Sequence, residues 1–426
     1  MKKIGSVLLV LMVVVLLVAC SGDSEKVEND PIETNVDDTA ATEEDIAPND
    51  GIIPDGEEAI RLSAEQKAKY YKVVEFMLPE GNFRDVIVDY MRKQSSIEWV
   101  CGEDFSVSEE WDHWGIALDF KKGQTYYGIP YADTKVSYIQ FQNALVDGTY
   151  TAKSSSWKTV YGVQCISSIM NSIQQFDPTV AGTSNEMMPG TKEFQAVICG
   201  DYKIPKSPKR TLDIKEANGE EVMYKAYMQL QKGDIIMTRD TLKSTSHFRV
   251  LVEDPTVYTN ATGKVIPSRC SVKTIEQTNA FDSQRTDGVK TTWFVDHIYS
   301  FTKLYETNYI PLTLASYSKP RSEMEVPYIA LDKALDPEVL AKKSFDNTVV
   351  SNFPIRYIDI EIIDESGTVV SKLPKINMPN TREIELKKYM TTVFKDLESG
   401  KKYTLVLSAG IAIDSCELDR AEFVLS

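Results

Sequence analysis

A cysteine, a histidine and a glutamate follow one another in an order that suits nucleophilic catalysis by a thiol. Cys165 ends the run Tyr-Gly-Val-Gln-Cys, and His247 and Glu276 lie on two later segments with strand-like alternation. Thiol catalysis needs a base that takes the thiol proton and returns it to the leaving amine, and a polar group that fixes the tautomer of that base. The sequence therefore predicts Cys165 as nucleophile, His247 as base and Glu276 as the orienting group.

A helix is predicted directly after the cysteine. Apolar residues recur at i, i+3, i+4 and i+7 from Ile166 to Ile173, and Asp177-Pro178 ends the pattern. Cys165 then lies in the first turn, where unpaired N–H groups and the positive end of the helix dipole favour a thiolate over a thiol. Only the thiolate is a useful nucleophile.

The other two residues are placed by predicted strands. Residues 232–237 read as a turn followed by a strand, and 247–253 and 270–278 read as further strands. His247 lies on the face opposite Phe248, because successive side chains alternate. Adjacent strands would place Glu276 behind the imidazole. Two alternatives for the third group stay open, namely Asn279, which a small register error would exchange with Glu276, and His297 from a later segment.

These motifs resemble a known group of enzymes. The run Gly-Ile-Pro-Tyr at 128–131, the cysteine that opens a helix, Gly-Asp-Ile at 233–235 and His247 are similar to NlpC-type cell-wall peptidases. The segment 274–279 looks more like the related CHAP (cysteine, histidine-dependent amidohydrolase/peptidase) branch, where a Glu follows the His. Both belong to the papain-like superfamily, and the resemblance covers about 126–311.

The resemblance implies an α+β fold, with helices packed on an antiparallel sheet. It implies hydrolysis of a peptide or amide bond of peptidoglycan, in the stem peptide or cross-bridge, through a thioester acyl-enzyme and without a cofactor. Tyr131 would help to hold the substrate carbonyl beside the backbone N–H of Cys165, and Gln164 is the second candidate for this substrate or oxyanion contact.

The residues around the nucleophile depart from the family pattern. The usual Asp-Cys-Ser-Gly is Gln-Cys-Ile-Ser at 164–167, and Phe248-Arg249 replaces the small residue that often follows the histidine. An alternative is therefore a catalytically inactive lipoprotein with the same fold that binds cell-wall peptide or glycan. A third interpretation, an enzyme that acts on a non-wall amide or transfers an acyl group, uses the same residues.

The start of the chain predicts its location. Lys2-Lys3 precede an apolar run over 7–18, and Leu-Val-Ala-Cys at 17–20 is typical of a bacterial lipoprotein signal with Cys20 as the lipidated residue. A transmembrane anchor is the alternative, but the run is short for about 30 Å of hydrocarbon. We expect a signal over 1–20 and a protein held outside the cytoplasmic membrane, facing the cell wall.

Composition limits the remaining function classes. Residues 21–60 are acidic, contain no aromatic residue and predict a disordered tether. The net charge of −16 argues against a nucleic-acid partner, which needs a clustered basic face. The three histidines and the cysteines lack the paired spacing of a metal site, so no metal is expected.

Two domains are expected after the tether, a hydrolase domain over 61–324 and a β-sandwich over 325–426. The first should open with helices over 63–78 and 83–94, carry a lid or specificity loop over 180–217 and continue with a helix over 218–229. The second has short strand patterns separated by turn residues, which suggests an immunoglobulin-like layout. These strands are expected at 355–363, 368–372, 382–386, 403–407 and 421–425. For this β-sandwich, binding of a cell-wall polymer or partner and a role as a spacer are equal alternatives.

Overall fold

A computed structural model describes residues 58–108, 115–180, 183–376, 378 and 380–426. The described residues all belong to one compact unit, Ile46–Ser426. The predicted signal, Cys20 and nearly all of the predicted tether fall outside the described residues. Within them, no helix is both long and apolar enough to cross a membrane. The fold is α+β, and its sheets are mainly antiparallel, as expected.

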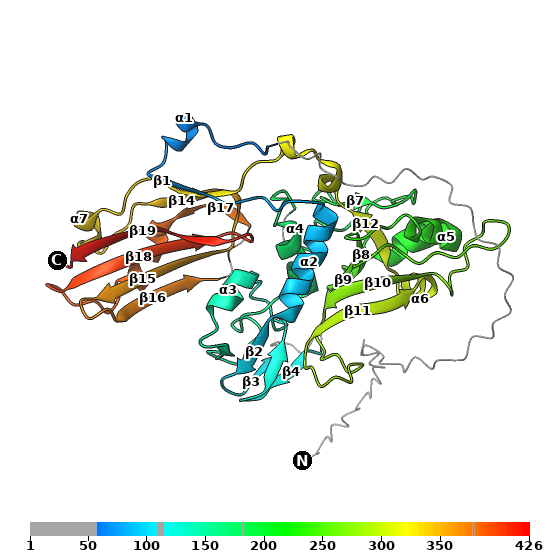
Figure 1. Cartoon of the computed structure of the whole chain (residues 1–426), viewed down its shortest axis with the longest axis horizontal. Helices are drawn as coiled ribbons and strands as arrows, with labels where there is room; N and C mark the ends of the chain where they lie inside the picture. Colours follow the sequence, from blue (N-terminus) through cyan, green and yellow to red (C-terminus); the bar gives the residue numbers. More distant parts are fainter. Residues whose placement is uncertain (1–57, 109–114, 181–182, 377, 379) are drawn as a thin grey trace, which may run out of the picture. The chain divides into compact units, whose positions relative to one another are not determined.

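A six-stranded antiparallel sheet (Figure 1) carries His247, Glu276 and the alternative candidate His297. Its strand order is β11-β10-β9-β8-β12-β7. The strands are β7 (Val197–Ile198), β8 (Ile235–Asp240), β9 (Thr245–Leu251), β10 (Ser271–Gln277), β11 (Trp293–Ser300) and β12 (Ile310–Thr313). The three strands predicted at 232–237, 247–253 and 270–278 are therefore confirmed, and they are neighbours in one sheet.

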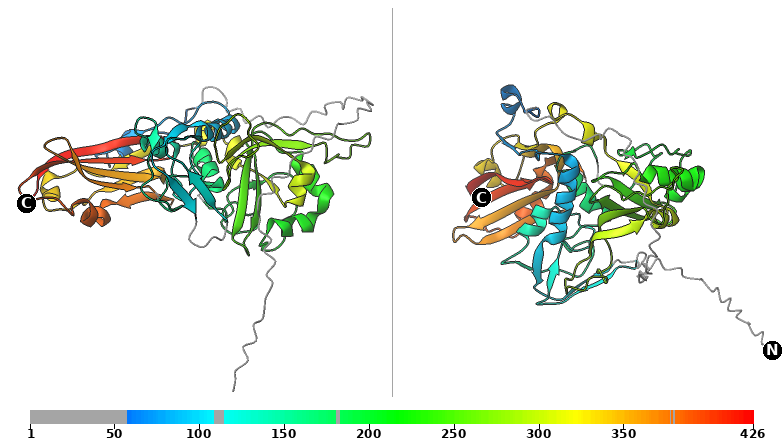
Figure 2. Two further views of the ribbon diagram at one scale, coloured as in Figure 1. Left: turned by 90° about the horizontal axis from the view of Figure 1, so that it is seen from below. Right: turned by 45° about the vertical axis from the view of Figure 1, so that its right-hand side comes forward.

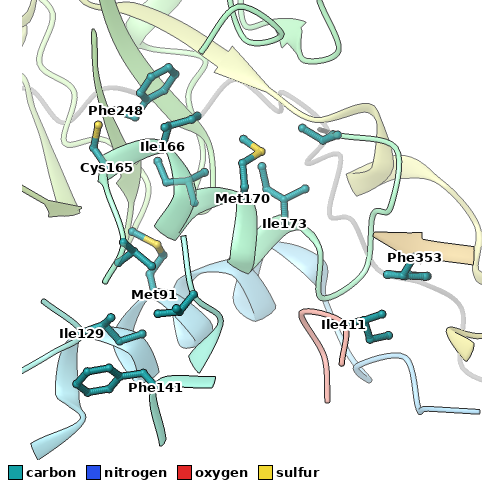
Figure 3. Close-up of a cluster of buried hydrophobic side chains, with 14 of the residues drawn as sticks. Met91, Ile129, Phe141, Cys165, Ile166, Met170, Ile173, Phe248, Phe353 and Ile411 are labelled. Atoms are coloured by element: carbon teal, nitrogen blue, oxygen red, sulfur yellow. The ribbon is translucent and has the colours of Figure 1, made fainter. Parts of the chain in front are cut away.

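The helix that begins at Cys165 is α4 (Cys165–Ile173), and it packs between α2 (Phe83–Ser96) and strand β9. Figure 3 shows Cys165 at its start and Ile166, Met170 and Ile173 along it. All nine residues of α4 are buried, including its polar ones, so the predicted apolar stripe is only part of the buried surface. The polar residues are hydrogen-bonded; Asn171, for example, donates to the carbonyl of Val136 at 2.8 Å.

Helix α5 (Thr211–Tyr227) begins earlier than the sequence predicts. Its first turn lies inside the segment predicted as a loop, and the helix is kinked at Gly219, which has φ 75°. The helix predicted to start at residue 218 is therefore the second half of a longer, kinked helix. Short helices α3 (Tyr138–Asn143) and α6 (Phe301–Glu306) complete this region, together with small sheets formed by β2 (Glu98–Cys101), β5 (Thr125–Tyr127) and β6 (Thr149–Tyr150), and by β3 (Phe105–Ser108) and β4 (Ala117–Phe120).

The helix predicted over 63–78 is wrong beyond its first turn. Ser63 caps α1 (Ala64–Lys67) with the expected capping box, but the helix ends after one turn. Strand β1 (Lys72–Glu75) follows and pairs with β13 (Tyr328–Leu331). The β-branched Val73 and Val74 fit a pleated surface, and this long-range pairing overrides the local helix signal.

The C-terminal segment forms two four-stranded antiparallel sheets, ordered β1-β13-β14-β17 and β16-β15-β18-β19. Figure 2 shows these strands from two further sides, coloured mainly orange to red. The structure confirms the five predicted strands as β15 (Tyr357–Asp364), β16 (Val369–Lys375), β17 (Thr381–Glu385), β18 (Lys402–Gly410) and β19 (Ser415–Val424). It adds β13, β14 (Thr348–Ile355) and β1, so the sheet pairing crosses the predicted boundary at residue 324. Two short helices, α7 (Pro337–Leu340) and α8 (Met390–Val393), lie on connections between these strands.

A buried arginine joins the C-terminal strands to the helix that carries the cysteine. Arg356 lies between β14 and β15, is 8% exposed, and donates to Asn171 Oδ1 at 2.5 Å and to the carbonyl of Lys135 at 2.8 Å. Burial lowers the pKa of Arg356 to about 10. Gln175, just past α4, also donates to the carbonyl of Ala412 at 2.8 Å. The C-terminal sheets are thus tied to α4 by hydrogen bonds.

Candidate active site

The start of α4 is held by the chain segment that contains the Gly-Ile-Pro-Tyr run. Val163 donates to the carbonyl of Pro130 at 2.9 Å, and Ala132 donates to the carbonyl of Val163 at 3.2 Å. Tyr131 therefore pairs with Val163, two residues before Cys165. The structure places Tyr131 beside the loop that leads to the candidate nucleophile.

Gly162 makes this close pairing possible. A Cβ at position 162 would lie 2.5 Å from the carbonyl oxygen of Pro130 and 2.6 Å from the Cβ of Ala132. Both neighbours belong to the paired segment, so neither can move without displacing the loop next to Cys165.

Gly162→Ala is expected to lower the free energy of unfolding by about 1–3 kcal/mol, because it overpacks this contact. Urea unfolding measures the effect. Gly263→Ala is the control, since a Cβ there meets nothing within 4 Å and only the positive φ of 75° is strained. If both variants lost the same small amount of unfolding free energy, the contact between Gly162 and residues 130–132 would not constrain the loop.

Gln164 is the residue before the helix, and its side chain is already engaged. Its backbone N–H donates to Ser167 Oγ at 2.7 Å, which caps the helix. Its side-chain Nε2 donates to Asp133 Oδ1 at 3.0 Å. An amide nitrogen carries two N–H groups, so this bond uses one of them. The structure therefore holds Gln164 toward Asp133, next to Cys165.

Cys165, His247 and Glu276 lie together in the structure. Cys165 is 5% exposed, and its thiol lies 3.9 Å from the carbonyl oxygen of Ser246, the residue before His247. The His247 imidazole interacts with the Cys165 side chain, and its Nε2 is bonded to Glu276 Oε2. Because Nε2 is engaged by the carboxylate, Nδ1 is the ring nitrogen left for the thiol.

Strand register explains this arrangement. Ile275 on β10 pairs with Val250 on β9, so Glu276 comes opposite Arg249. His247 is two residues from Arg249 on the same strand and therefore shares its face. The carboxylate of Glu276 can then reach both side chains.

Three further residues belong to this cluster and are missed by the sequence analysis. Arg249 donates through Nε to Glu276 Oε2 at 2.8 Å, and the Tyr299 hydroxyl donates to Glu276 Oε1 at 2.6 Å. The Arg249 guanidinium lies 3.7 Å from the ring centre of Tyr299 and 4.4 Å from that of Tyr309. The alternation that places His247 opposite Phe248 also places Arg249 on the face of His247, and this signal could have found it.

Interactions within the cluster shift the pKa values of Glu276 and His247. Burial alone would raise the pKa of Glu276, but the charges of Arg249 and His247 and hydrogen bonds from His247 and Tyr299 bring it well below its usual range. Burial would lower the pKa of His247, but the Glu276 charge and hydrogen bonds to Cys165 and Glu276 raise it to about 9. The imidazole is therefore protonated at neutral pH.

The raised pKa of His247 predicts a pH-dependent stability. The protonated form of His247 stabilises the folded state. This stabilisation is complete below the pKa of histidine in the unfolded chain, near 6.5, and is lost as pH rises through about 9. The difference in unfolding free energy between the parent and His247→Gln should shrink by about 3 kcal/mol from pH 6 to pH 10. Chemical denaturation at both pH values measures it, and an unchanged difference would contradict the pairing with Glu276.

The two alternative candidates for the group that orients His247 are His297 and Asn279, and neither occupies the position at its Nε2. His297 on β11 is bonded through Nε2 to Asp282 Oδ2 at 3.0 Å and stacks on Phe294 with ring centres 4.6 Å apart. Its backbone pairs with Thr274, so it is not the residue that meets His247. Asn279 lies two residues beyond the end of β10, and Glu276 occupies the position at Nε2 of His247.

No model of a known protein family matches the chain, and no curated protein matches it at a significant level. Among the described residues, no group of three or more His, Cys, Asp or Glu side chains is arranged to hold a metal ion.

Proposed function

We propose that this chain is a cysteine hydrolase that cleaves a peptide or amide bond. The observation that carries the proposal is the contiguous arrangement of the thiol of Cys165, the imidazole of His247 and the buried carboxylate of Glu276. Each group has the partner that the reaction requires, and the cysteine lies in the first turn of a buried helix.

The reaction would proceed in two steps. The Cys165 thiolate attacks the substrate carbonyl carbon, and the resulting oxyanion is stabilised by N–H groups of the first turn of α4, which have no partner within the helix. His247 then donates its proton to the leaving amine, and a thioester remains on Cys165. Water, deprotonated by His247, hydrolyses the thioester and regenerates the thiolate.

Glu276 keeps Nε2 of His247 engaged through both steps, so Nδ1 stays directed at the sulfur. Arg249 and Tyr299 in turn fix the carboxylate. Tyr131 and the second N–H of Gln164 are the candidates for contacting the substrate carbonyl. No step requires a cofactor.

Peptidoglycan is the substrate that we propose, in its stem peptide or cross-bridge. The resemblance to NlpC-type and CHAP peptidases and the lipoprotein-like start of the chain support it. In this proposal the fold around α4 and the six-stranded sheet is papain-like, and the C-terminal sheets are an immunoglobulin-like sandwich. A lipid on Cys20 would hold the enzyme outside the cytoplasmic membrane, near the wall.

A catalytically inactive wall-binding lipoprotein is the second candidate. The observation that favours it is the low exposure of Cys165, of which only 5% is accessible. The two candidates differ in whether the thiol of Cys165 is activated, and this can be measured directly.

Thiol labelling tests the proposal. Iodoacetamide at pH 7 should modify Cys165 at least about tenfold faster than Cys199 or Cys416, because the His247 imidazolium stabilises its thiolate. Burial raises the pKa of Cys199 to about 12 and that of Cys416 to about 11, and these two serve as internal controls. His247→Ala should remove most of the rate advantage. Peptide mass spectrometry measures each site, and labelling of Cys165 no faster than of Cys199 would favour the binding protein.

A further inference from the structure

A concave site lies away from the triad, on the C-terminal strands. It is a groove of about 430 Å³ between residues 140–161 and the sheet β16-β15-β18-β19. This volume is within the usual range for small-molecule sites. Three tyrosines line it, together with two lysines and two acidic residues: Tyr150, Tyr161, Tyr357, Lys153, Lys372, Asp359 and Glu417.

Asp359, one of the residues that line this groove, carries an unsatisfied acceptor. Asp359 Oδ2 pairs with Lys372 Nζ at 3.1 Å. Its other oxygen, Oδ1, is buried and has no hydrogen-bond donor among the described residues. A buried acceptor without a donor costs free energy, so a ligand O–H or N–H that reaches Oδ1 would be favoured.

The tyrosine rings are fixed in place by the backbone. The Tyr150 hydroxyl accepts from the backbone N–H of Tyr161 at 2.8 Å, and the two ring centres are 6.3 Å apart. Gly410 leaves room for the third ring, because a Cβ there would lie 2.2 Å from Cε1 of Tyr357. Tyr150 and Tyr357 are largely buried, so Tyr161 supplies most of the exposed aromatic surface of the groove.

The charges along the groove balance. Lys153 and Lys372 offset Asp359 and Glu417, so the groove offers no net charge to attract a strongly charged ligand. Sugars combine apolar C–H faces, which can pack on tyrosine rings, with hydroxyl edges that donate hydrogen bonds. We propose that this groove binds a neutral saccharide, with Tyr161 against a sugar face and Asp359 Oδ1 accepting from a hydroxyl or acetamide group.

The groove is linked to the candidate nucleophile through the chain. Tyr161 lines it and stands four residues before Cys165, in the loop that Gly162 holds against Pro130. A glycan strand bound here would contact the same loop that presents the thiol. Saccharide binding does not depend on hydrolysis at Cys165, so the two proposals can fail separately.

Calorimetry tests the proposal on the compact unit from residue 46 onward, with Cys165→Ala to prevent turnover. The probes are a β-1,4-linked N-acetylglucosamine tetramer and maltotetraose. We expect binding of at least one, weakened at least about tenfold by Tyr161→Ala and by Asp359→Ala. Glu365→Ala, an exposed acidic residue on the loop after β15, should leave the affinity unchanged.

The two probes distinguish the type of sugar. Tighter binding of the acetylated tetramer would assign the groove to wall-type amino sugars, whereas equal binding would assign it to neutral hexose rings in general. No heat with either probe at millimolar concentration, or equal affinities in all variants, would overturn the proposal. Thermal melts of both groove variants check that any loss of binding is not a loss of folding.

Discussion

Cys165→Ala is expected to lower the rate of peptidoglycan hydrolysis by at least about 10⁴-fold, because no other group in the cluster can form the thioester. His247→Ala should cause a loss of similar size, since the thiolate and the proton for the leaving amine both depend on the imidazole. The double variant should be no worse than either single one, because residues that act as a unit are not additive. Release of soluble fragments from purified cell wall measures all three.

Cys199→Ala is the matched control for this loss. Cys199 is also buried, and its thiol lies 4.0 Å from Asp234 Oδ2, away from the triad. Its replacement should leave the rate within about twofold of the parent. If the Cys165→Ala variant hydrolysed the wall at the parent rate, another group would have to perform the reaction.

Glu276→Gln should impair both activity and stability. The amide keeps the size of the side chain but removes the charge that holds His247 protonated at neutral pH, so we expect a loss of about 10³–10⁴-fold in kcat. It also leaves the buried Arg249 without its carboxylate, which should cost about 3–5 kcal/mol of unfolding free energy. Stopped assays and urea unfolding give the two values.

A second histidine–carboxylate pair, between a histidine of the same sheet and an aspartate on the β10–β11 connection, supplies the control. His297 and Asp282 are bonded at 3.0 Å, and the Asp282 side chain is 2% exposed, much like that of Glu276. Asp282→Asn should reduce stability without the loss in kcat that Glu276→Gln causes. Adding Arg249→Met to Glu276→Gln should recover part of the stability but none of the activity. An equal loss of kcat in Asp282→Asn would mean that Glu276 acts only through folding.

The sequence predicts the strands and the cysteine helix well because their signals are local. The stripe from Ile166 to Ile173 and the alternation in β9 and β10 are visible in short windows, and both elements form there. The strand β1 could not be found in this way. Its partner β13 lies more than 250 residues away, and the capping box at Ser63 points locally to a helix.

Local signals predict only part of the candidate site, because the rest depends on long-range packing. Residue types and strand order predict Cys165, His247 and Glu276, and the three lie together in the structure. In the sequence Arg249 stands out only as a departure from a family pattern, although its charge is the strongest of the interactions that lower the pKa of Glu276. Tyr299 lies on the later strand β11 and Tyr309 comes directly before β12, so only the tertiary fold brings them to Arg249.

The central claim is tested most directly by mass spectrometry of purified peptidoglycan fragments incubated with the unit from residue 46 onward, beside its Cys165→Ala and Glu276→Gln variants. We predict new fragments from one type of peptide or amide bond, each bond having gained one water. They should be absent with Cys165→Ala and strongly reduced with Glu276→Gln. Intact fragments after incubation with the parent chain, on wall material of several chemotypes, would contradict the hydrolase and leave the wall-binding lipoprotein as the better account.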